Sequence, residues 1–165
     1  MSGLFRNLLT FLLALWRYNT VLPQAPVSAH FFITPFDTGI ATLKSDIYLQ
    51  LAESAQVDYM VRTGLVRSVT ARGLRFVNAA QMVKFARPTR LFSRVCVQTQ
   101  VVYADSKCAW FSHAFFVGPT EHAQVLVKMK FKRGTVTAPP GEVLGPFTGE
   151  KPKWIDSWET TLAGL

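Results

Sequence analysis

The sequence predicts an α+β fold in which one long buried helix is followed by an antiparallel meander of strands. We expect the helix over residues 46–63, because Ser45 is a good N-cap and Gly64 stands just past the last apolar position. Runs rich in β-branched and aromatic residues follow it, separated by short polar turns. These strand-like runs span residues 74–85, 91–104, 108–117 and 122–132.

The predicted helix has apolar side chains nearly all the way round. Tyr48, Leu51, Ala52, Ala55 and Tyr59 recur at helical spacing and form one stripe. A helix that is apolar on every side is a buried one, so we expect it in the core. The rest of its apolar surface comes from Leu49, Val57, Met60 and Val61.

The strand-like runs show which faces they bury. The last run alternates Lys128 and Lys130 with Met129, which predicts one basic face and one buried face. The first run is interrupted around Asn78-Ala-Ala80. A shorter strand, His30–Thr34, is expected before the helix.

Residues 3–18 predict a further helix, with a broad apolar face opposite a narrow polar one that holds Arg6, Asn7, Thr10 and Arg17. Its apolar run is shorter than the roughly 20 residues that cross a bilayer. Arg17 also interrupts the run, which disfavours a signal peptide. We expect the helix either to lie in a membrane interface or to pack against the domain or a partner subunit. The broad face consists of Leu4, Phe5, Leu8, Leu9, Phe11, Leu12, Leu13, Leu15 and Trp16.

The chain therefore divides into three parts around a single domain. Residues 1–27 hold the first helix and a linker that contains prolines. Residues 28–133 form the domain itself. Residues 134–165 are rich in Pro and Gly and are expected to end in a short helix over Trp154–Leu162.

Composition narrows the classes of function. Of 165 residues, 49% are apolar and only 17% are charged, which excludes a disordered chain and favours burial in an oligomer or a membrane. A net charge of +8 attracts nucleic acid, anionic lipid, the pyrophosphate of coenzyme A or an acidic carrier protein. Nucleic-acid binding is disfavoured, because the aromatic residues lie in apolar runs rather than among exposed basic ones.

No metal ion or cofactor is expected. His30, His113 and His122 are scattered along the chain and form no pair with metal-ligand spacing. Cys96 and Cys108 lie in strand-like runs without a CxxC motif, so we interpret them as buried thiols.

Asp37 is the strongest candidate for chemistry, because it lies in a Gly-containing loop that leads into the predicted helix. A helix N-terminus has free backbone N–H groups and a dipole that favour developing negative charge. The loop Asp37-Thr-Gly39 and the helix start near Ser45–Ile47 could thus supply a carboxylate and oxyanion donors. The alternative is an Asx-type turn, in which the carboxylate only caps the loop backbone.

Four local motifs stand in a recognisable order: Pro35-Phe-Asp37, Tyr48, Arg62-Thr-Gly64-Leu65 and Phe85-Ala-Arg-Pro88. Over residues 28–133 this order resembles the thioesterase-like branch of the 4-hydroxybenzoyl-CoA thioesterase superfamily. The resemblance implies a hot-dog fold, in which an antiparallel sheet wraps a central helix. It also implies hydrolysis of an acyl-CoA or acyl-carrier-protein thioester by a homodimer or tetramer with sites in the subunit interface. Acyl chain length and a preference for aryl groups stay open.

The resemblance also implies roles for individual residues. Asp37 would attack the thioester carbonyl or act as the base for a water molecule. Gly39, Thr42 and Ser45 would line the loop around the oxyanion, and Tyr48 would pack against the sheet with its hydroxyl toward the loop.

One position departs from the family. Many relatives carry a His about five residues before the helix Tyr, followed by two Asn, whereas Leu43 and Lys44-Ser45 stand there in this chain. The polar partner of Asp37 would then be missing, or be replaced by Thr42 or Ser45. The departure motivates a second hypothesis, a hot-dog protein that binds an acyl group or lipid without turning it over.

Glu53 is the second candidate carboxylate, because another branch of hot-dog thioesterases uses a carboxylate on the central helix. It lies off the main apolar stripe, among Leu49 and Met60, where we expect partial desolvation. The alternative is an ordinary surface Glu. Asp58 and Arg62 are expected to form an i,i+4 pair.

Arg87, Arg90, Lys128 and Lys130 could receive the phosphates of coenzyme A or the acidic face of a carrier protein. A solvated basic edge is the alternative, since Lys on strands also discourages edge pairing. We expect the protein in the cytoplasm or attached to a membrane through residues 3–18.

Overall fold

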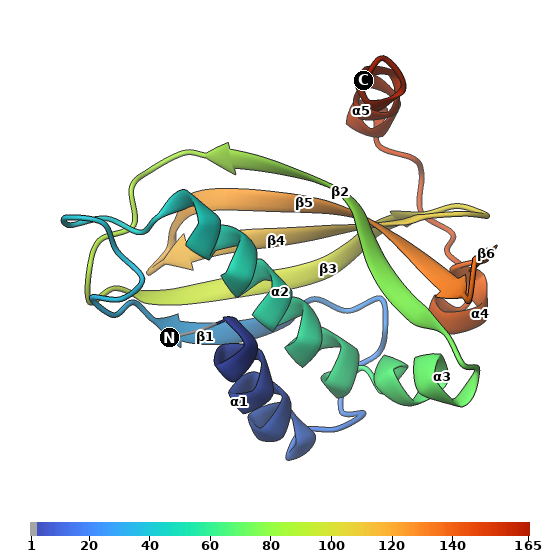
Figure 1. Cartoon of the computed structure of the whole chain (residues 1–165), viewed down its shortest axis with the longest axis horizontal. Helices are drawn as coiled ribbons and strands as arrows, with labels where there is room; N and C mark the ends of the chain where they lie inside the picture. Colours follow the sequence, from blue (N-terminus) through green and yellow to red (C-terminus); the bar gives the residue numbers. More distant parts are fainter. Residues whose placement is uncertain (1–2) are drawn as a thin grey trace.

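The computed structural model describes the backbone from Gly3 to Leu165 and the side chains from Arg6 onward. A curled antiparallel sheet wraps around the long helix α2 (Ser45–Arg62), which confirms the predicted α+β fold (Figure 1). The strand order is β1-β3-β4-β5-β2, and β6 pairs with β5 beyond the end of β4. The strands are β1 (Val27–Phe32), β2 (Arg75–Phe85), β3 (Arg94–Ala104), β4 (Ala109–Val117), β5 (Thr120–Arg133) and β6 (Val136–Ala138). The other helices are α1 (Gly3–Leu15), α3 (Leu65–Ala71), α4 (Gly141–Leu144) and α5 (Lys153–Ala163).

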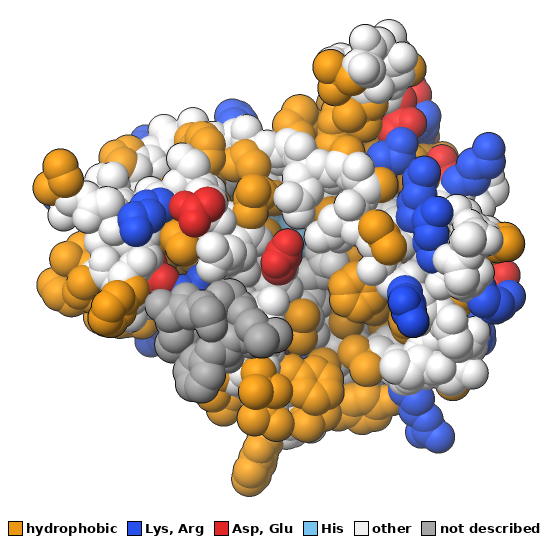
Figure 2. Space-filling view, in the orientation of Figure 1, with side chains coloured by type: hydrophobic (Ala, Val, Ile, Leu, Met, Phe, Trp, Pro, Cys, Tyr) orange, Lys and Arg blue, Asp and Glu red, His pale blue; other side chains and the backbone are white. Residues whose placement is uncertain are grey.

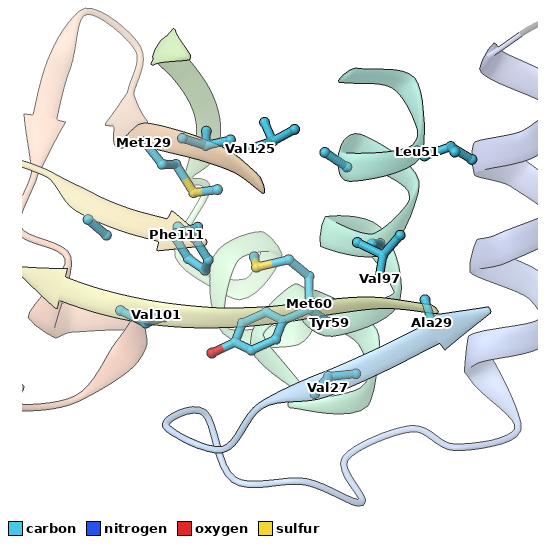
Figure 3. Packing of buried hydrophobic residues seen from close by; sticks show 14 of the residues in the cluster. Val27, Ala29, Leu51, Tyr59, Met60, Val97, Val101, Phe111, Val125 and Met129 are labelled. Atoms are coloured by element: carbon cyan, nitrogen blue, oxygen red, sulfur yellow. The ribbon is translucent and has the colours of Figure 1, made fainter. Parts of the chain in front are cut away.

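Helix α2 occupies the core, as its all-round apolar surface predicted. It packs against inward-facing side chains of the sheet, among them Val97, Phe111, Val125 and Met129 (Figure 3). Tyr59 is fully buried within this cluster and meets Phe111 edge to face. Packing of this kind, rather than intrinsic propensity, stabilises a helix in a protein.

The start of α2 differs from the prediction by one residue. Lys44 takes the N-cap position and Ser45 is the first helical residue, so the predicted Ser45 cap is wrong. Backbone bonds hold the entry instead: the Leu43 N–H donates to Thr89 O at 2.8 Å, and the Lys44 N–H donates to Asp37 O at 3.1 Å. The chain direction is fixed by these contacts, so no side-chain cap is needed.

The end of α2 continues into a short helix that the sequence pattern did not predict. Gly64 has φ 72° and joins α2 to α3. A Cβ at Gly64 would stand 2.7 Å from the Asn19 side chain, so only glycine fits this junction. The short elements β6 and α4 were also missed, because three or four residues carry too little periodicity.

The predicted strands are confirmed in order, with small shifts. The first strand is Val27–Phe32 rather than 30–34, paired with β3 from Val27–Thr99 to Phe32–Arg94. The predicted interruption of β2 is a register shift between Asn78 and Ala80. The alternation in β5 holds: Met129 is fully buried, while Lys128 lies on the outer face. Of the two cysteines, Cys108 is buried as expected and Cys96 is only half-buried.

Helix α1 packs against α2, one of the two placements expected for it, but it does so through its narrow polar face. Arg6 and Ala14 are buried and Asn7, Thr10 and Phe11 are half-buried. The broad apolar face points to solvent, with Leu8, Leu9, Leu12, Leu13, Leu15 and Trp16 exposed. Leu4 and Phe5, assigned to the same face, lie outside the residues whose side chains are described. Among the described helices, none is long and apolar enough to cross a membrane.

Candidate functional site

Asp37 lies in the segment that connects β1 to α2, at one end of the sheet. The segment folds back on itself, with a bridge between Thr38 and Leu43 and an N–H of Gly39 that donates to Thr42 O at 2.9 Å. A second bridge, between Thr42 and Arg90, ties it to the connection between β2 and β3. Two connections far apart in sequence therefore hold the backbone of Asp37 in place.

The Asp37 carboxylate is buried and fully engaged. Its Oδ2 accepts the Thr34 N–H at 3.0 Å and the Thr34 hydroxyl at 2.7 Å. Its Oδ1 accepts a hydrogen bond from Nη2 of Arg6 on α1, in an ion pair buried on both sides. The Asx-type capping expected as the alternative is thus present, together with a cationic partner that the sequence pattern did not indicate.

These contacts set the ionisation of the site. Burial alone raises the pKa of Asp37, but the hydrogen bonds from Thr34 and the charge of Arg6 outweigh it and leave that pKa below its usual value. Asp37 is therefore ionised at neutral pH, as a nucleophile or a water-orienting carboxylate has to be.

A cavity of about 200 Å³ opens beside this ion pair, between α1, β1 and α2. Arg6 and Asp37 stand in its wall together with Leu9, Phe31 and Leu51. Figure 3 shows Leu51 pointing from α2 toward α1. A larger cavity of about 500 Å³ follows along α1 and shares Thr10, Leu13, His30 and Phe31 with the first one. A pocket with apolar walls and a few polar groups is typical of sites for small ligands.

The loop residues expected around Asp37 lie on its solvent side. Gly39, Thr42 and Ser45 are exposed, and among the described hydrogen bonds none joins them to the carboxylate. In the first turn of α2, Ser45 and Asp46 are exposed, whereas Ile47 and Tyr48 are buried. The structure thus brings Asp37 together with Thr34 and Arg6 rather than with Thr42 or Ser45.

Tyr48 packs edge to face against Phe85 and Phe115, as expected, but its hydroxyl points to the connection between β2 and β3 rather than to the Asp37 loop. The hydroxyl donates to Thr89 Oγ1 at 3.0 Å. Thr89 Oγ1 is 3.4 Å from Nδ1 of His122, which also lies 3.1 Å from Pro88 O. Tyr48, Thr89 and His122 thus form a polar chain next to the segment that connects β1 to α2. The sequence pattern did not connect these three residues.

Glu53 lies apart from Asp37. It is exposed on α2 and lines a shallow pocket with Asn7, Gln56 and Phe76 near the edge strand β2. The expected partial desolvation of Glu53 is therefore wrong, because its side chain is exposed in this pocket. The surface interpretation fits its position.

The basic residues considered for phosphate binding split into two groups. Arg87 and Arg90 are exposed in the connection between β2 and β3. The bridge between Thr42 and Arg90 ties this connection to the segment that holds Asp37. Lys128 and Lys130 lie on the outer face of the sheet, away from α2, and Lys128 Nζ is 2.8 Å from Glu159 Oε2. Only the first group shares an end of the molecule with Asp37.

Asp58 and Arg62 form the expected i,i+4 pair at 3.2 Å. Both line the larger cavity together with Arg17 and Arg94. Burial raises the pKa of Asp58 despite the opposing charge of Arg62. The groove along α1 thus holds a carboxylate at each end, with pKa values displaced in opposite directions.

Comparisons with known proteins agree with this geometry. Residues 41–144 match the thioesterase-like superfamily. The probable thioesterase YbaW of Escherichia coli aligns with a TM-score of 0.66 and 16% identity over 71% of this chain and 92% of its own. The DHNA-CoA thioesterase of Staphylococcus aureus aligns with a TM-score of 0.62 and 13% identity over 84% and 91%. The gentisyl-coenzyme A thioesterase BH1999 aligns with a TM-score of 0.60 and 16% identity over 68% and 93%. No curated protein matched by sequence.

At these identities the solved structures establish the hot-dog fold alone. The family match begins after Asp37 and ends before α5, so it covers the central helix and the meander. The carboxylate site and α1 are features of this chain that the match does not describe.

Proposed function

Because the chain belongs to the thioesterase-like superfamily, we propose that it hydrolyses an acyl-CoA or acyl-carrier-protein thioester with Asp37 as the working carboxylate. The observation that carries the proposal is an ionised, buried carboxylate in the wall of a cavity with apolar sides. Two similar structures are named as coenzyme A thioesterases, which supports a thioester as the substrate class. Glu53 is not assigned a catalytic role, because it is exposed and lies apart from this cavity.

Hydrolysis at Asp37 needs water and no other reactant. Asp37 takes a proton from water, the water oxygen adds to the thioester carbon, and the carbonyl π electrons move to its oxygen. When the carbonyl re-forms, the C–S bond breaks and the thiolate takes the proton back from Asp37, which yields an acid and a thiol. Direct attack by Asp37 through a mixed anhydride is the alternative route, and the low pKa of Asp37 is compatible with it.

The test is thiol release from a panel of acyl- and aryl-CoAs by wild type, Asp37→Asn and Glu53→Gln. We expect Asp37→Asn to lose about 10³-fold or more in kcat, as enzymes do when a nucleophile or base is removed, and Glu53→Gln to stay within about threefold. Loss of turnover only in Glu53→Gln would move the site to α2. Full activity of Asp37→Asn would refute the proposal.

A binding protein without turnover is the second candidate. The observation that favours it is the full engagement of the Asp37 carboxylate by Thr34 and Arg6, which competes with an attacking water. Under this alternative the wild type binds an acyl-CoA saturably in calorimetry and releases no thiol from any member of the panel.

We further propose that the outer face of α1 contacts a lipid surface. Trp16 is 92% exposed, and Figure 2 shows hydrophobic side chains along the lower edge of the molecule, where α1 ends. The face continues over exposed Phe32, which stacks on Phe92. Arg17 and Arg94 line the neighbouring cavity and add positive charge. An apolar helix face beside basic residues is typical of binding to an anionic bilayer surface.

Co-sedimentation with vesicles that contain anionic lipid tests the membrane contact. The double variant Leu12→Ser, Trp16→Ser is expected to lower the bound fraction about tenfold or more, since it removes two large exposed apolar side chains. Val136→Ser on β6 is the control, because the exposed fraction of Val136 (66%) lies between those of Leu12 (50%) and Trp16 (92%), and β6 is at the other end of the sheet from β1. Equal binding of all three proteins would show that α1 is not the contact.

A homodimer or tetramer remains part of the proposal. The strand β2 has only β5 as a neighbour in the sheet and exposes Phe76, Val77, Met82 and Phe85. An exposed apolar edge strand favours pairing with another copy. Analytical ultracentrifugation should find an oligomer that Val77→Lys weakens, and a wild-type monomer at micromolar concentration would refute it.

A further inference from the structure

One terminal nitrogen of the Arg6 guanidinium is buried and lacks an acceptor among the described residues. Its Nη2 donates to Asp37 Oδ1, whereas its Nη1 is buried and has no hydrogen-bond partner among the residues that the structure describes. Arg6 as a whole is 5% exposed, so bulk water does not satisfy that nitrogen. A buried charged donor without an acceptor is costly, and each such group in a native protein calls for an explanation.

Arg6 stands in the wall of the cavity beside the ion pair, where a bound ligand could bring an acceptor. Arg6 and Asp37 share its wall with Thr34 and with the apolar side chains of Leu9 and Phe31. The guanidinium is planar and holds its two terminal nitrogens in a fixed fork. An oxygen that accepts from Nη1 therefore sits next to the carboxylate that accepts from Nη2.

We propose that Arg6 is a catalytic residue whose Nη1 donates a hydrogen bond to the carbonyl oxygen of the thioester bound in this cavity. The inference rests on the proposed function and names the group that stabilises its transition state. The fork geometry places the thioester carbon beside Asp37, where an attacking water or the carboxylate itself reaches it. The expected oxyanion donors from the first turn of α2 are then not required for this contact.

Charge moves toward Arg6 during the reaction. As the water oxygen adds to the thioester carbon and Asp37 takes its proton, the carbonyl π electrons become a lone pair on the oxygen that faces Nη1. The oxyanion is then held by a full positive charge in a cavity closed by α1, where such an interaction is stronger than in water. When the C–S bond breaks, the lone pair returns to the carbonyl and the proton passes from Asp37 to the thiolate.

The proposal makes α1 part of the active site. Arg6 is the only charged residue of the helix and stands before the part of the chain that the family match covers. Its side of α1 is anchored to α2 by Asn7, whose Oδ1 accepts the Ser54 hydroxyl at 2.5 Å. Asn7 points to α2 rather than to Asp37, so it offers a control for loosening of the helix.

The experiment has two readouts, and the first is the kcat for thiol release from the best acyl- or aryl-CoA. Arg6→Met is expected to lower kcat about 100- to 1000-fold, the effect of removing one oxyanion donor. Arg6→Lys should recover part of this, because it keeps the charge without the fork. Asn7→Ala should stay near wild type, and circular dichroism confirms that each variant is folded.

The second readout isolates the carbonyl contact without any turnover. Two non-hydrolysable analogues of the same acyl-CoA are compared: a ketone, with CH2 in place of sulfur, and a thioether, with CH2 in place of the carbonyl. Wild type and Asn7→Ala should bind the ketone about 10- to 100-fold more tightly than the thioether, the effect of one hydrogen bond to a charged donor. Arg6→Met should bind both equally.

The outcomes separate this inference from the function on which it rests. Turnover lost in Asp37→Asn but kept in Arg6→Met, or a ketone preference that survives in Arg6→Met, overturns the role of Arg6 and leaves the thioesterase intact. Turnover kept in Asp37→Asn, or none in wild type, overturns the proposed function and the catalytic role of Arg6 with it. An equal loss in Asn7→Ala and Arg6→Met also overturns the role, because it assigns the effect to the position of α1.

Discussion

The helices at the two ends of the chain attach to the domain in opposite ways. Helix α5 stands across the molecule from α1 in Figure 1 and buries Ile155 and Trp158 against Trp110, on the outer face of the sheet. Helix α1 buries Arg6 at Asp37 and exposes its five described leucines, Leu8, Leu9, Leu12, Leu13 and Leu15. Helix α5 therefore follows the usual pattern of an amphipathic helix, and α1 reverses it.

The difference separates a structural attachment from a functional one. Apolar burial holds α5 and requires no particular charge on the sheet. The attachment of α1 includes a buried ion pair, which contributes little net stability compared with apolar residues but fixes where the charged groups lie. Departures from the expected polarity tend to occur at functional sites. The reversed polarity of α1 thus agrees with a role at Asp37.

The largest effect should come from a matched pair of tryptophans, one on each side of this comparison. Trp158 is 7% exposed and Trp16 is 92% exposed. Trp158→Ala should lower the free energy of unfolding by about 3–5 kcal/mol, the usual cost of emptying an aromatic site in a core. Trp16→Ala should change it by less than about 0.5 kcal/mol. Urea denaturation measures both, and equal effects would show that the outer face of α1 is covered in solution.

A smaller effect is expected from the ion pair of each helix. Arg6→Met leaves the buried Asp37 carboxylate without its cation and should cost about 3 kcal/mol, the low end for a broken buried pair. On α5, Glu159→Gln removes the ion-pair partner of Lys128 on β5. Because Glu159 is partly exposed, this change should lower the free energy of unfolding by at most about 1 kcal/mol. Similar losses in urea denaturation would mean that Arg6 and Asp37 are solvated in the native protein.

The fold could be predicted because its signals are local. The all-round apolar surface of α2 and the alternation in β5 each follow from side-chain periods within a single element. The position of Asp37 in a loop before α2 was readable for the same reason. Boundaries could not be predicted to the residue, as at Lys44, because backbone contacts with Thr89 decide where α2 begins.

The partner of Asp37 could not be predicted, because the two residues are 31 positions apart and lie on different elements. The broad apolar face of residues 3–18 predicted the wrong side of the helix as the buried one, since apolar faces are usually buried. One signal was present: Arg6 is the only charge on an otherwise uncharged helix. The hydrogen-bonded chain from Tyr48 through Thr89 to His122 could not be predicted either, because the three residues are far apart in the sequence and meet only in the folded protein.

The smallest expected effect is a pH dependence in the attachment of α1 that the attachment of α5 should not share. The pKa of Asp37 is below its usual value, so the released carboxylate takes up a proton before the folded one does as the pH falls. Its contribution to holding α1 is complete above about pH 4 and is lost as the pH falls through the pKa that Asp37 has in the folded protein. Helix α5 keeps its apolar contacts over this range.

Pepsin, which is active in this range, should therefore cut α1 at its exposed leucines increasingly as the pH falls below about 4, while α5 stays protected. The buried His113 adds a background, because burial lowers its pKa to about 3 and the whole fold loses stability as the pH falls from about 6.5. Asp37→Asn separates the two effects. At about pH 4.5, near the upper limit of the range in which pepsin cuts, cleavage of α1 should be faster in Asp37→Asn than in wild type, and its further rise as the pH falls should be no steeper than that of the core. The same steep rise in wild type and Asp37→Asn would show that the carboxylate does not hold α1, and that the two terminal helices differ only in which side chains they expose.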